Sequence, residues 1–143
     1  MPNKIILKKK ISNFYKKIFI PGDKSISIRW ILISSLASGI SKAENLLTSH
    51  DVMASIKAIK KLGARVFINK NICKIHGVGV GGYKYKKDLV IDAQNSGTLS
   101  RLITGILIDT PFPIKIIGDK SLSKRDFRRI TEPLSKFGAS FNL

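Results

Sequence analysis

The chain reads Pro21-Gly22-Asp23-Lys24-Ser25-Ile26-Ser27-Ile28-Arg29 at a turn that leads into an expected helix. Free N–H groups at a helix start and the helix dipole favour a bound anion. Ser25 can donate a hydrogen bond to that anion, and Arg29 lies one turn further along the same helical face. We therefore predict a phosphate or carboxylate site at Lys24, Ser25 and Arg29. The alternative is that Ser25 only caps the helix while both cations face solvent.

Strands and helices are expected to alternate on both sides of this stretch. Residues 16–20 have the pattern of a strand that ends at the Pro-Gly turn. Residues 25–38 form an apolar run that is too long for a typical strand, so we predict a buried helix although Ile26, Ile28 and Trp30 alternate. Residues 52–62 place their apolar side chains on one helical face. The other expected elements are strands 42–47, 65–68, 72–76, 89–91 and 113–117, a loop at 77–82, helices 95–108 and 124–137, and a strand beginning at 139.

The same order of elements occurs twice in the chain. Arg29 lies four residues after Ser25, and Arg101 lies four residues after Gly97, 72 positions later. Gly63 and Gly138 end two similar segments 75 positions apart. We predict an α/β fold with a first unit at about 16–77 and a second at about 88–143, truncated before its return strand. A strand without its partner exposes backbone donors and acceptors, so we expect the chain to be incomplete as a functional unit.

Basic residues dominate the charge of the chain. It holds 26 Lys and Arg against nine Asp and Glu, a formal net charge of +17 over 143 residues. This balance suits anionic partners, and a cationic nucleic-acid-binding module is the alternative function. The lysines are spread rather than striped, however, and no nucleic-acid motif is recognisable. We therefore expect most of the excess charge to lie on a solvated surface and nucleic acid not to be the partner.

The remaining composition argues against several other classes of protein. Cys73 is the only cysteine, which excludes an internal disulfide and is compatible with a reducing compartment. His50 and His76 lack the spacing of metal ligands, so we predict neither a metal site nor a catalytic histidine. No targeting segment stands out, and the most apolar run, residues 30–37, is too short to cross a bilayer. We expect a cytoplasmic protein without a membrane partner.

Two further stretches contain residues that suit an anion. Asn95-Ser96-Gly97-Thr98 opens a helix, where Asn95 can cap the N-terminus and Gly97 lets a ligand approach the backbone. Arg101 is expected to pack or pair structurally. Arg125 is well placed to make a planar fork to a carboxylate or phosphate. Because no carboxylate pair or His–Asp arrangement accompanies these residues, they support anion binding more strongly than catalysis.

Taken together and in order, five motifs that span nearly the whole chain resemble the EPSP synthase (3-phosphoshikimate 1-carboxyvinyltransferase) family. The motifs are Pro21-Gly22-Asp23-Lys24-Ser25-Ile26-Ser27-x-Arg29, Leu46-Leu47-x-Ser49-x-Asp51, Leu62-Gly63-Ala64, Asn95-Ser96-Gly97-Thr98-x-x-Arg101-Leu102 and Gly118-Asp119-x-Ser121-Leu122-Ser123-Lys124-Arg125. The resemblance implies two domains, each with three βαβαββ units. It also implies an N-terminal portion, in which residues 1–15 are a lead belonging with the other, absent domain and residues 16–143 form a partial domain.

The resemblance further implies a reaction and a role for each anion-site residue. The reaction would transfer the enolpyruvyl group of phosphoenolpyruvate to the 5-hydroxyl of shikimate 3-phosphate, in aromatic amino-acid biosynthesis, without a metal or organic cofactor. Lys24 would be catalytic and contact both substrates, whereas Ser25 and Arg29 would hold shikimate 3-phosphate. The implied phosphoenolpyruvate pocket consists of Lys24, Asn95, Gly97 and Arg125. A complementary C-terminal chain would be the macromolecular partner.

Four positions depart from the family pattern. Ile28 stands in place of the usual His, His50 in place of Asp, Gln94 in place of Gly, and Asp126 in place of Pro. The carboxylate of Asp126, directly after Arg125, could compete for its guanidinium or weaken its pull on an anion. The family's acid/base carboxylates and further arginines lie in the missing portion. We therefore expect no turnover by this chain alone.

Overall fold

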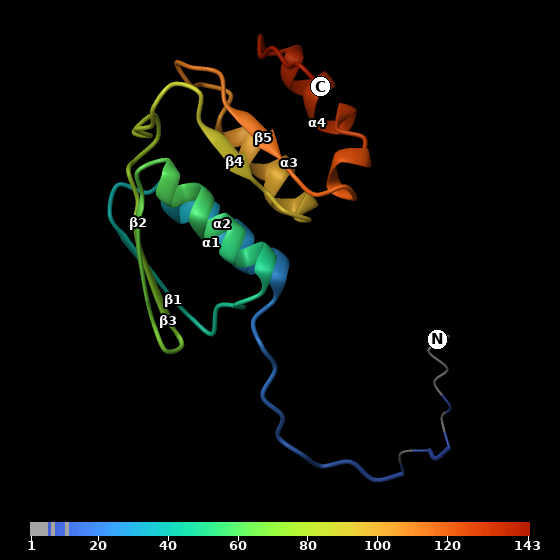
Figure 1. The fold of residues 1–143 in the computed structure, drawn as a ribbon. Helices are drawn as coiled ribbons and strands as arrows, with labels where there is room; N and C mark the ends of the chain where they lie inside the picture. Colours follow the sequence, from blue (N-terminus) through green and yellow to red (C-terminus); the bar gives the residue numbers. More distant parts are fainter. Residues whose placement is uncertain (1–5, 7, 11) are drawn as a thin grey trace.

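The first half of the chain folds as two helices beside a three-stranded sheet (Figure 1). The computed structural model describes residue 6, residues 8–10 and residues 12–143. The elements of this half are α1 (Lys24–Ser35), β1 (Ile40–Glu44), α2 (His50–Lys61), β2 (Arg65–Asn69) and β3 (Ile72–His76). The sheet order is β1-β3-β2, and the central strand β3 runs antiparallel to both neighbours. The predicted hairpin of residues 65–76 is therefore present.

The second half follows the predicted repeat. Its elements are β4 (Val90–Asp92), α3 (Gly97–Ile106), β5 (Lys115–Ile117), the 3-10 helix η1 (Leu122–Lys124) and α4 (Arg128–Ser135). β4 and β5 form a two-stranded parallel sheet. β1 is paired with a later strand, β3, whereas β5 is paired with an earlier strand, β4. Among the described residues, the two halves thus pair their strands differently.

The apolar run after the Pro-Gly turn is a helix, as predicted, although α1 begins at Lys24 rather than Ser25. The cap is Asp23, whose side chain accepts a hydrogen bond of 2.7 Å from the backbone N–H of Ile26. The Ser27 hydroxyl donates to the Asp23 carbonyl at 2.6 Å and accepts from the Leu47 N–H at 3.2 Å. The Asp23 carboxylate thus satisfies the Ile26 N–H of the helix start from within the chain. Ser25 is therefore not the cap.

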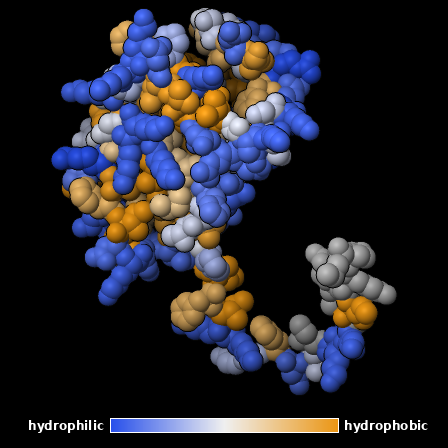
Figure 2. Space-filling view, in the orientation of Figure 1, coloured by the Kyte–Doolittle hydropathy of each residue, from blue (hydrophilic) through white to orange (hydrophobic). Residues whose placement is uncertain are grey.

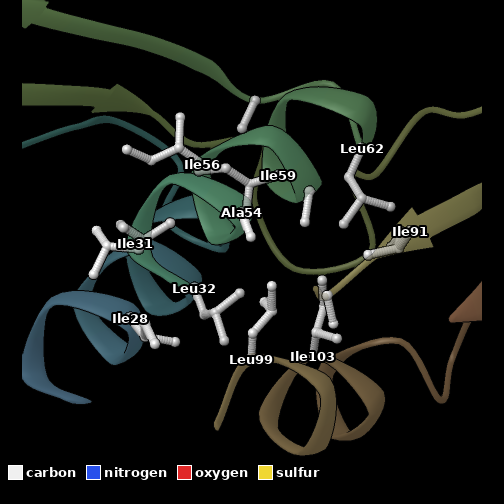
Figure 3. Packing of buried hydrophobic residues seen from close by; sticks show 14 of the residues in the cluster. Ile28, Ile31, Leu32, Ala54, Ile56, Ile59, Leu62, Ile91, Leu99 and Ile103 are labelled. Atoms are coloured by element: carbon white, nitrogen blue, oxygen red, sulfur yellow. The ribbon is translucent and has the colours of Figure 1, made fainter. Parts of the chain in front are cut away.

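One hydrophobic core joins the two halves (Figure 3). Ile28 and Ile31 of α1 and Ile59 of α2 are fully buried, and Leu99 and Ile103 of α3 point toward them from the opposite side. Each buried aliphatic side chain of this size contributes about 1.5–3 kcal/mol relative to exposure. The core therefore fixes how α3 is placed against α1 and α2, and with it the relation between the anion-binding stretches predicted at the starts of α1 and α3.

Several predicted elements are wrong or misplaced. Residues 16–20 and 139–143 form no strand, because no strand among the described residues offers them a backbone ladder. The strand predicted at 42–47 lies at Ile40–Glu44. The helix predicted at 124–137 is interrupted, because Arg125 has an extended backbone (φ −81°, ψ 142°) and α4 begins only at Arg128.

The segment before α1 extends away from the folded part of the chain (Figure 1). Figure 2 shows hydrophobic side chains along it, and Tyr15, Phe19 and Ile20 are exposed. Within the predicted lead, residues 1–5, 7 and 11 lie outside the described residues, so its assignment to another domain stays a prediction. The domain boundaries at 15 and 77 likewise stay predictions. None of the described helices is long and apolar enough to cross a membrane.

Candidate functional site

A cavity of about 400 Å³ lies where the first turns of α1, α2 and α3 meet the segment after β5. Its lining residues are Lys24, Arg29, Asp51, Asn95, Gly97, Thr98, Arg101, Leu102, Arg125 and Ile130. Each helix N-terminus presents free N–H groups and the positive end of its dipole, which favour an anion. The cavity thus brings together five of the six predicted site residues. The sixth, Ser25, lies on the same turn as Lys24 but is not among the lining residues.

Lys24 is held at the mouth of this cavity by an ion pair. Its Nζ atom lies 3.1 Å from Oδ2 of Asp51, which is in the first turn of α2. The Lys24 side chain is 52% exposed and that of Asp51 is 20% exposed. An anion can therefore reach Lys24 while Asp51 fixes the direction of the ammonium group. Asp51 was not predicted as a site residue, although it belongs to one of the five motifs.

Asn95 lies just before α3 and faces two charged side chains. Its Oδ1 accepts a hydrogen bond of 3.1 Å from Nη2 of Arg125, and its Nδ2 donates to Oδ2 of Asp119 at 2.6 Å. The predicted capping role of Asn95 is wrong, because the cap of α3 is Ser96, whose hydroxyl accepts from the Leu99 N–H at 3.2 Å. With Ser96 as the cap, the Asn95 amide is available to hold Arg125.

Gly97 is required by the position of Arg125. A Cβ atom added to Gly97 would lie 2.5 Å from Nη1 of Arg125, which is far closer than ordinary contact. The group that approaches the backbone at Gly97 is a guanidinium of the chain itself. That a ligand also approaches there stays a prediction. The extended backbone of Arg125 directs its side chain from the β5 side onto the first turn of α3.

Arg101 has the packing role that was expected and also lines the cavity. Its Nη2 donates to the Asp126 carbonyl at 3.2 Å, and its guanidinium carbon lies 5.8 Å from the centre of the Phe127 ring. Its Nε atom is buried and has no hydrogen-bond partner among the described residues. Arg101 therefore connects α3 to the start of α4 while placing positive charge beside the cavity.

Asp126 does not bind the Arg125 guanidinium, because its carboxylate is paired with Arg128. Its carboxylate accepts three hydrogen bonds of 2.8–3.1 Å from the Arg128 side chain and one of 2.9 Å from the Arg128 N–H. These bonds to Arg128 lower the pKa of Asp126 to about 2. Asp126 is therefore ionised at neutral pH and paired with Arg128. The sequence could not reveal this, since Arg125 and Arg128 are both near Asp126 along the chain.

The charge of the cavity lining is strongly positive. Its cations are Lys24, Arg29, Arg101 and Arg125, and Asp51 is the one carboxylate in the lining. Such a set can bind a ligand with more than one negative charge, and arginines can do so through two parallel hydrogen bonds. The described residues contain no group of His, Cys, Asp or Glu that could hold a metal ion. The geometry therefore supports recognition of phosphates and carboxylates by fixed cations.

The sequence of the chain is similar to those of one enzyme family. A model of the EPSP synthase (3-phosphoshikimate 1-carboxyvinyltransferase) family matches residues 8–143. The chain is 43% identical over 125 residues to the 3-phosphoshikimate 1-carboxyvinyltransferase of Desulforamulus reducens. This alignment covers 87% of this chain and 29% of that protein. It is 40% identical over 134 residues to the enzyme of Sulfurihydrogenibium sp., covering 94% of this chain and 31% of that protein.

The fold of the chain is similar to that of a solved structure from the same family. The EPSP synthase from Acinetobacter baumannii superposes with a TM-score of 0.81 at 36% identity, covering 87% of this chain and 28% of that one. The chain therefore spans less than a third of the length of these relatives. Because the match extends over nearly all of its residues in both sequence and structure, the chain belongs to the EPSP synthase family.

Proposed function

We propose that this chain supplies the cationic half of an active site that transfers the enolpyruvyl group of phosphoenolpyruvate to the 5-hydroxyl of shikimate 3-phosphate. The observation that carries the proposal is the convergence of Lys24, Arg29 and Arg125 on one cavity. Both substrates are anions that repel each other in water. Fixed cations can hold them side by side, which lowers the entropic and electrostatic barrier to their reaction.

In the proposed reaction, the 5-hydroxyl gives up its proton to a base, its oxygen forms a bond to C2 of phosphoenolpyruvate, and C3 gains a proton from an acid as the C2=C3 double bond is lost. The resulting tetrahedral intermediate then loses phosphate from C2 and a proton from C3, which regenerates the double bond in the product. Lys24, which lines the cavity and is paired with Asp51, would contact both substrates. Arg29 and Ser25 would hold shikimate 3-phosphate, and Arg125 would bind phosphoenolpyruvate above Gly97.

Asn95 would support the phosphoenolpyruvate side of the cavity through its hydrogen bond to Arg125. Among the described lining residues the only carboxylate is that of Asp51, which is already paired with Lys24. We propose that the acid/base groups come from the portion of the enzyme that this chain does not contain, or from a complementary C-terminal chain. On this proposal the chain alone binds ligands without turnover, and it does so in the cytoplasm, where Cys73 stays a free thiol.

Ligand titrations of the purified chain test the binding part of the proposal. Shikimate 3-phosphate and phosphoenolpyruvate are titrated into wild-type chain and into Lys24→Ala, Arg29→Ala and Arg125→Ala variants, with binding followed by NMR shifts or calorimetry. The matched control is Lys57→Ala, which removes the same charge from an exposed position of α2 away from the cavity lining. The proposal requires losses of roughly tenfold or more at the cavity residues and no change for Lys57→Ala.

The same variants test the nucleic-acid alternative and the need for a second chain. Equal losses for Lys57→Ala and Arg125→Ala with a DNA oligonucleotide, and no binding of either small substrate, would refute the enolpyruvyl-transfer proposal. Release of inorganic phosphate is measured for the chain alone and for the chain mixed with the remaining two-thirds of a relative's enzyme. Turnover by the chain alone would contradict the proposed division of the active site.

A further inference from the structure

Asp119 does not line the cavity, but it is hydrogen-bonded to Asn95, which does. Oδ2 of Asp119 accepts from Nδ2 of Asn95 at 2.6 Å, and Oδ1 of Asn95 accepts from Nη2 of Arg125 at 3.1 Å. We propose that Asp119 is a positioning residue, which fixes the orientation of the Asn95 amide and thereby the place of the Arg125 guanidinium. The inference deepens the proposed function, because it concerns the same anion-binding site.

The chemistry of the three groups gives Asp119 this control. An asparagine amide has a donor end and an acceptor end of nearly the same shape, whereas an ionised carboxylate only accepts and a guanidinium only donates. With the carboxylate of Asp119 on one side, the donor end of Asn95 is held toward it. The acceptor end then faces Arg125. In the reversed orientation the Asn95 NH₂ group would face a guanidinium that has no acceptor, and both hydrogen bonds would be lost.

Asp119 is itself held firmly in place. Its Oδ1 accepts from the N–H groups of Ser121 at 3.0 Å and Leu122 at 2.8 Å, at the start of η1. Its own N–H donates to the Gln94 carbonyl at 2.8 Å, so the segment after β5 is joined to the segment before α3. The hydrogen bonds from Asn95 and from these N–H groups lower the pKa of Asp119, which keeps it ionised and accepting at neutral pH.

The consequence for a ligand follows from what remains free on Arg125. Nη2 is engaged by Asn95, and Nη1 lies over Gly97, so the plane of the guanidinium is defined before any ligand arrives. A planar fork that is already oriented loses less conformational freedom on binding an anion. If the Asn95 amide is free to reverse, Arg125 loses its acceptor. Anion binding must then also order the Arg125 side chain, which lowers the affinity.

The test uses Asp119→Asn and Asp119→Ser in the complete 143-residue chain. Asp119→Asn keeps an oxygen for the Ser121 and Leu122 N–H groups but removes the obligatory acceptor for Asn95. Asp119→Ser can also accept from those N–H groups but is too short to reach Asn95. Both are combined with Asn95→Ala in a double-mutant cycle, and the probe is inorganic phosphate, with phosphoenolpyruvate as a second ligand. Backbone NMR spectra and urea unfolding report whether each variant keeps the fold.

We expect each Asp119 variant to weaken phosphate binding by about threefold to tenfold, and to have no further effect when Asn95 is already alanine. An equal loss in the Asn95→Ala background would overturn the inference, because Asp119 would then act only through the turn that it caps. Unchanged phosphate affinity in all single variants would overturn it as well.

A ligand-free measurement separates this inference from the proposed function. In the wild-type chain, the Asn95 side-chain NH₂ signal should show the shift of a strong hydrogen bond to a carboxylate, and Asp119→Asn should remove that shift. An Asn95 signal that is the same in both proteins refutes the positioning role, whether or not phosphate binds. If instead the signal behaves as expected while neither phosphate nor phosphoenolpyruvate binds, the inference on Asp119 stands and the proposed function fails.

Discussion

The substitution Gly97→Ala separates ligand binding from stability, because it adds one methyl group at the place where Arg125 lies. The added Cβ would be 2.5 Å from Nη1 of Arg125, whereas ordinary contact begins at 3.4 Å. The clashing atom is the far end of a flexible side chain rather than backbone. We therefore expect the guanidinium to retreat by about 0.9 Å, the difference between those two distances, while α3 stays in place.

The expected magnitude follows from the contacts that this displacement disturbs. A retreat of that size moves the guanidinium away from Gly97 and strains the 3.1 Å hydrogen bond that its Nη2 donates to Asn95. Charge-assisted hydrogen bonds contribute about 1.5–3 kcal/mol, and one misplaced bond to an anion thus corresponds to roughly a tenfold loss or more. The helix itself gains up to about 1 kcal/mol from Gly to Ala, because the flexible glycine backbone loses more entropy on folding.

The assay compares Gly97→Ala with Gly105→Ala, a matched control in the same helix. A Cβ on Gly105 meets nothing within 4 Å, so this change alters helix propensity without touching the cavity. Phosphoenolpyruvate affinity is measured by titration, and the free energy of unfolding by urea. We expect the affinity to fall only for Gly97→Ala, with neither variant destabilised. Equal affinity in wild type and Gly97→Ala would refute the reasoning, as would a loss of several kcal/mol in stability.

Three further predictions concern stability and reactivity. Tyr83→Phe should lower the free energy of unfolding by roughly 1 kcal/mol, because it removes the 2.7 Å hydroxyl–hydroxyl bond to buried Ser35; an unchanged urea midpoint would contradict this. Burial raises the pKa of the Cys73 thiol, so alkylation at pH 8 should be slow in the folded chain and fast in urea, and equal rates would be inconsistent with its 1% exposure. The pKa of Asp126 is lowered from 3.8 to about 2 by Arg128, so the contribution of this carboxylate to stability is complete above pH 4 and lost as the pH falls toward 2. Arg128→Ala should weaken the acid dependence of the unfolding free energy in urea titrations, and an unaltered dependence would refute the pairing.

Sequence patterns predicted the strongly periodic elements well and the isolated ones poorly. The helix expected at 52–62 is α2 at His50–Lys61, and the hairpin expected at 65–76 is present. These elements depend on apolar periodicity and on pairing between neighbours along the chain. Residues 16–20 have a comparable strand pattern but form none, because a strand also requires a partner, which local sequence does not specify.

For the candidate site, too, local sequence predicted the residues but not the contacts between them. Lys24, Asn95, Gly97 and Arg125 could be singled out because each lies at a turn or an expected helix start, where backbone N–H groups are free. Arg29 could be singled out because it lies one helical turn after Ser25 on the same face. Their mutual geometry could not be foreseen. Asp51 was missed as the partner of Lys24. The cap of α1 is Asp23 rather than Ser25, which was the alternative reading of that residue, and the cap of α3 is Ser96 rather than the expected Asn95.

The sequence by itself determined the duplicated α/β pattern, the family resemblance and the three stretches that carry the anion-binding residues. The motifs follow from spacing within a few residues, where helix and strand periods act, and the duplication follows from similar segments 72 and 75 positions apart. Only the tertiary structure decided that Arg125 lies over Gly97, that Asp126 is paired with Arg128, and that Asp119 reaches Arg125 through Asn95. The links from Arg125 back to Gly97 and Asn95 join residues about 30 positions apart, and they depend on the shared core that places α3 against α1 and α2.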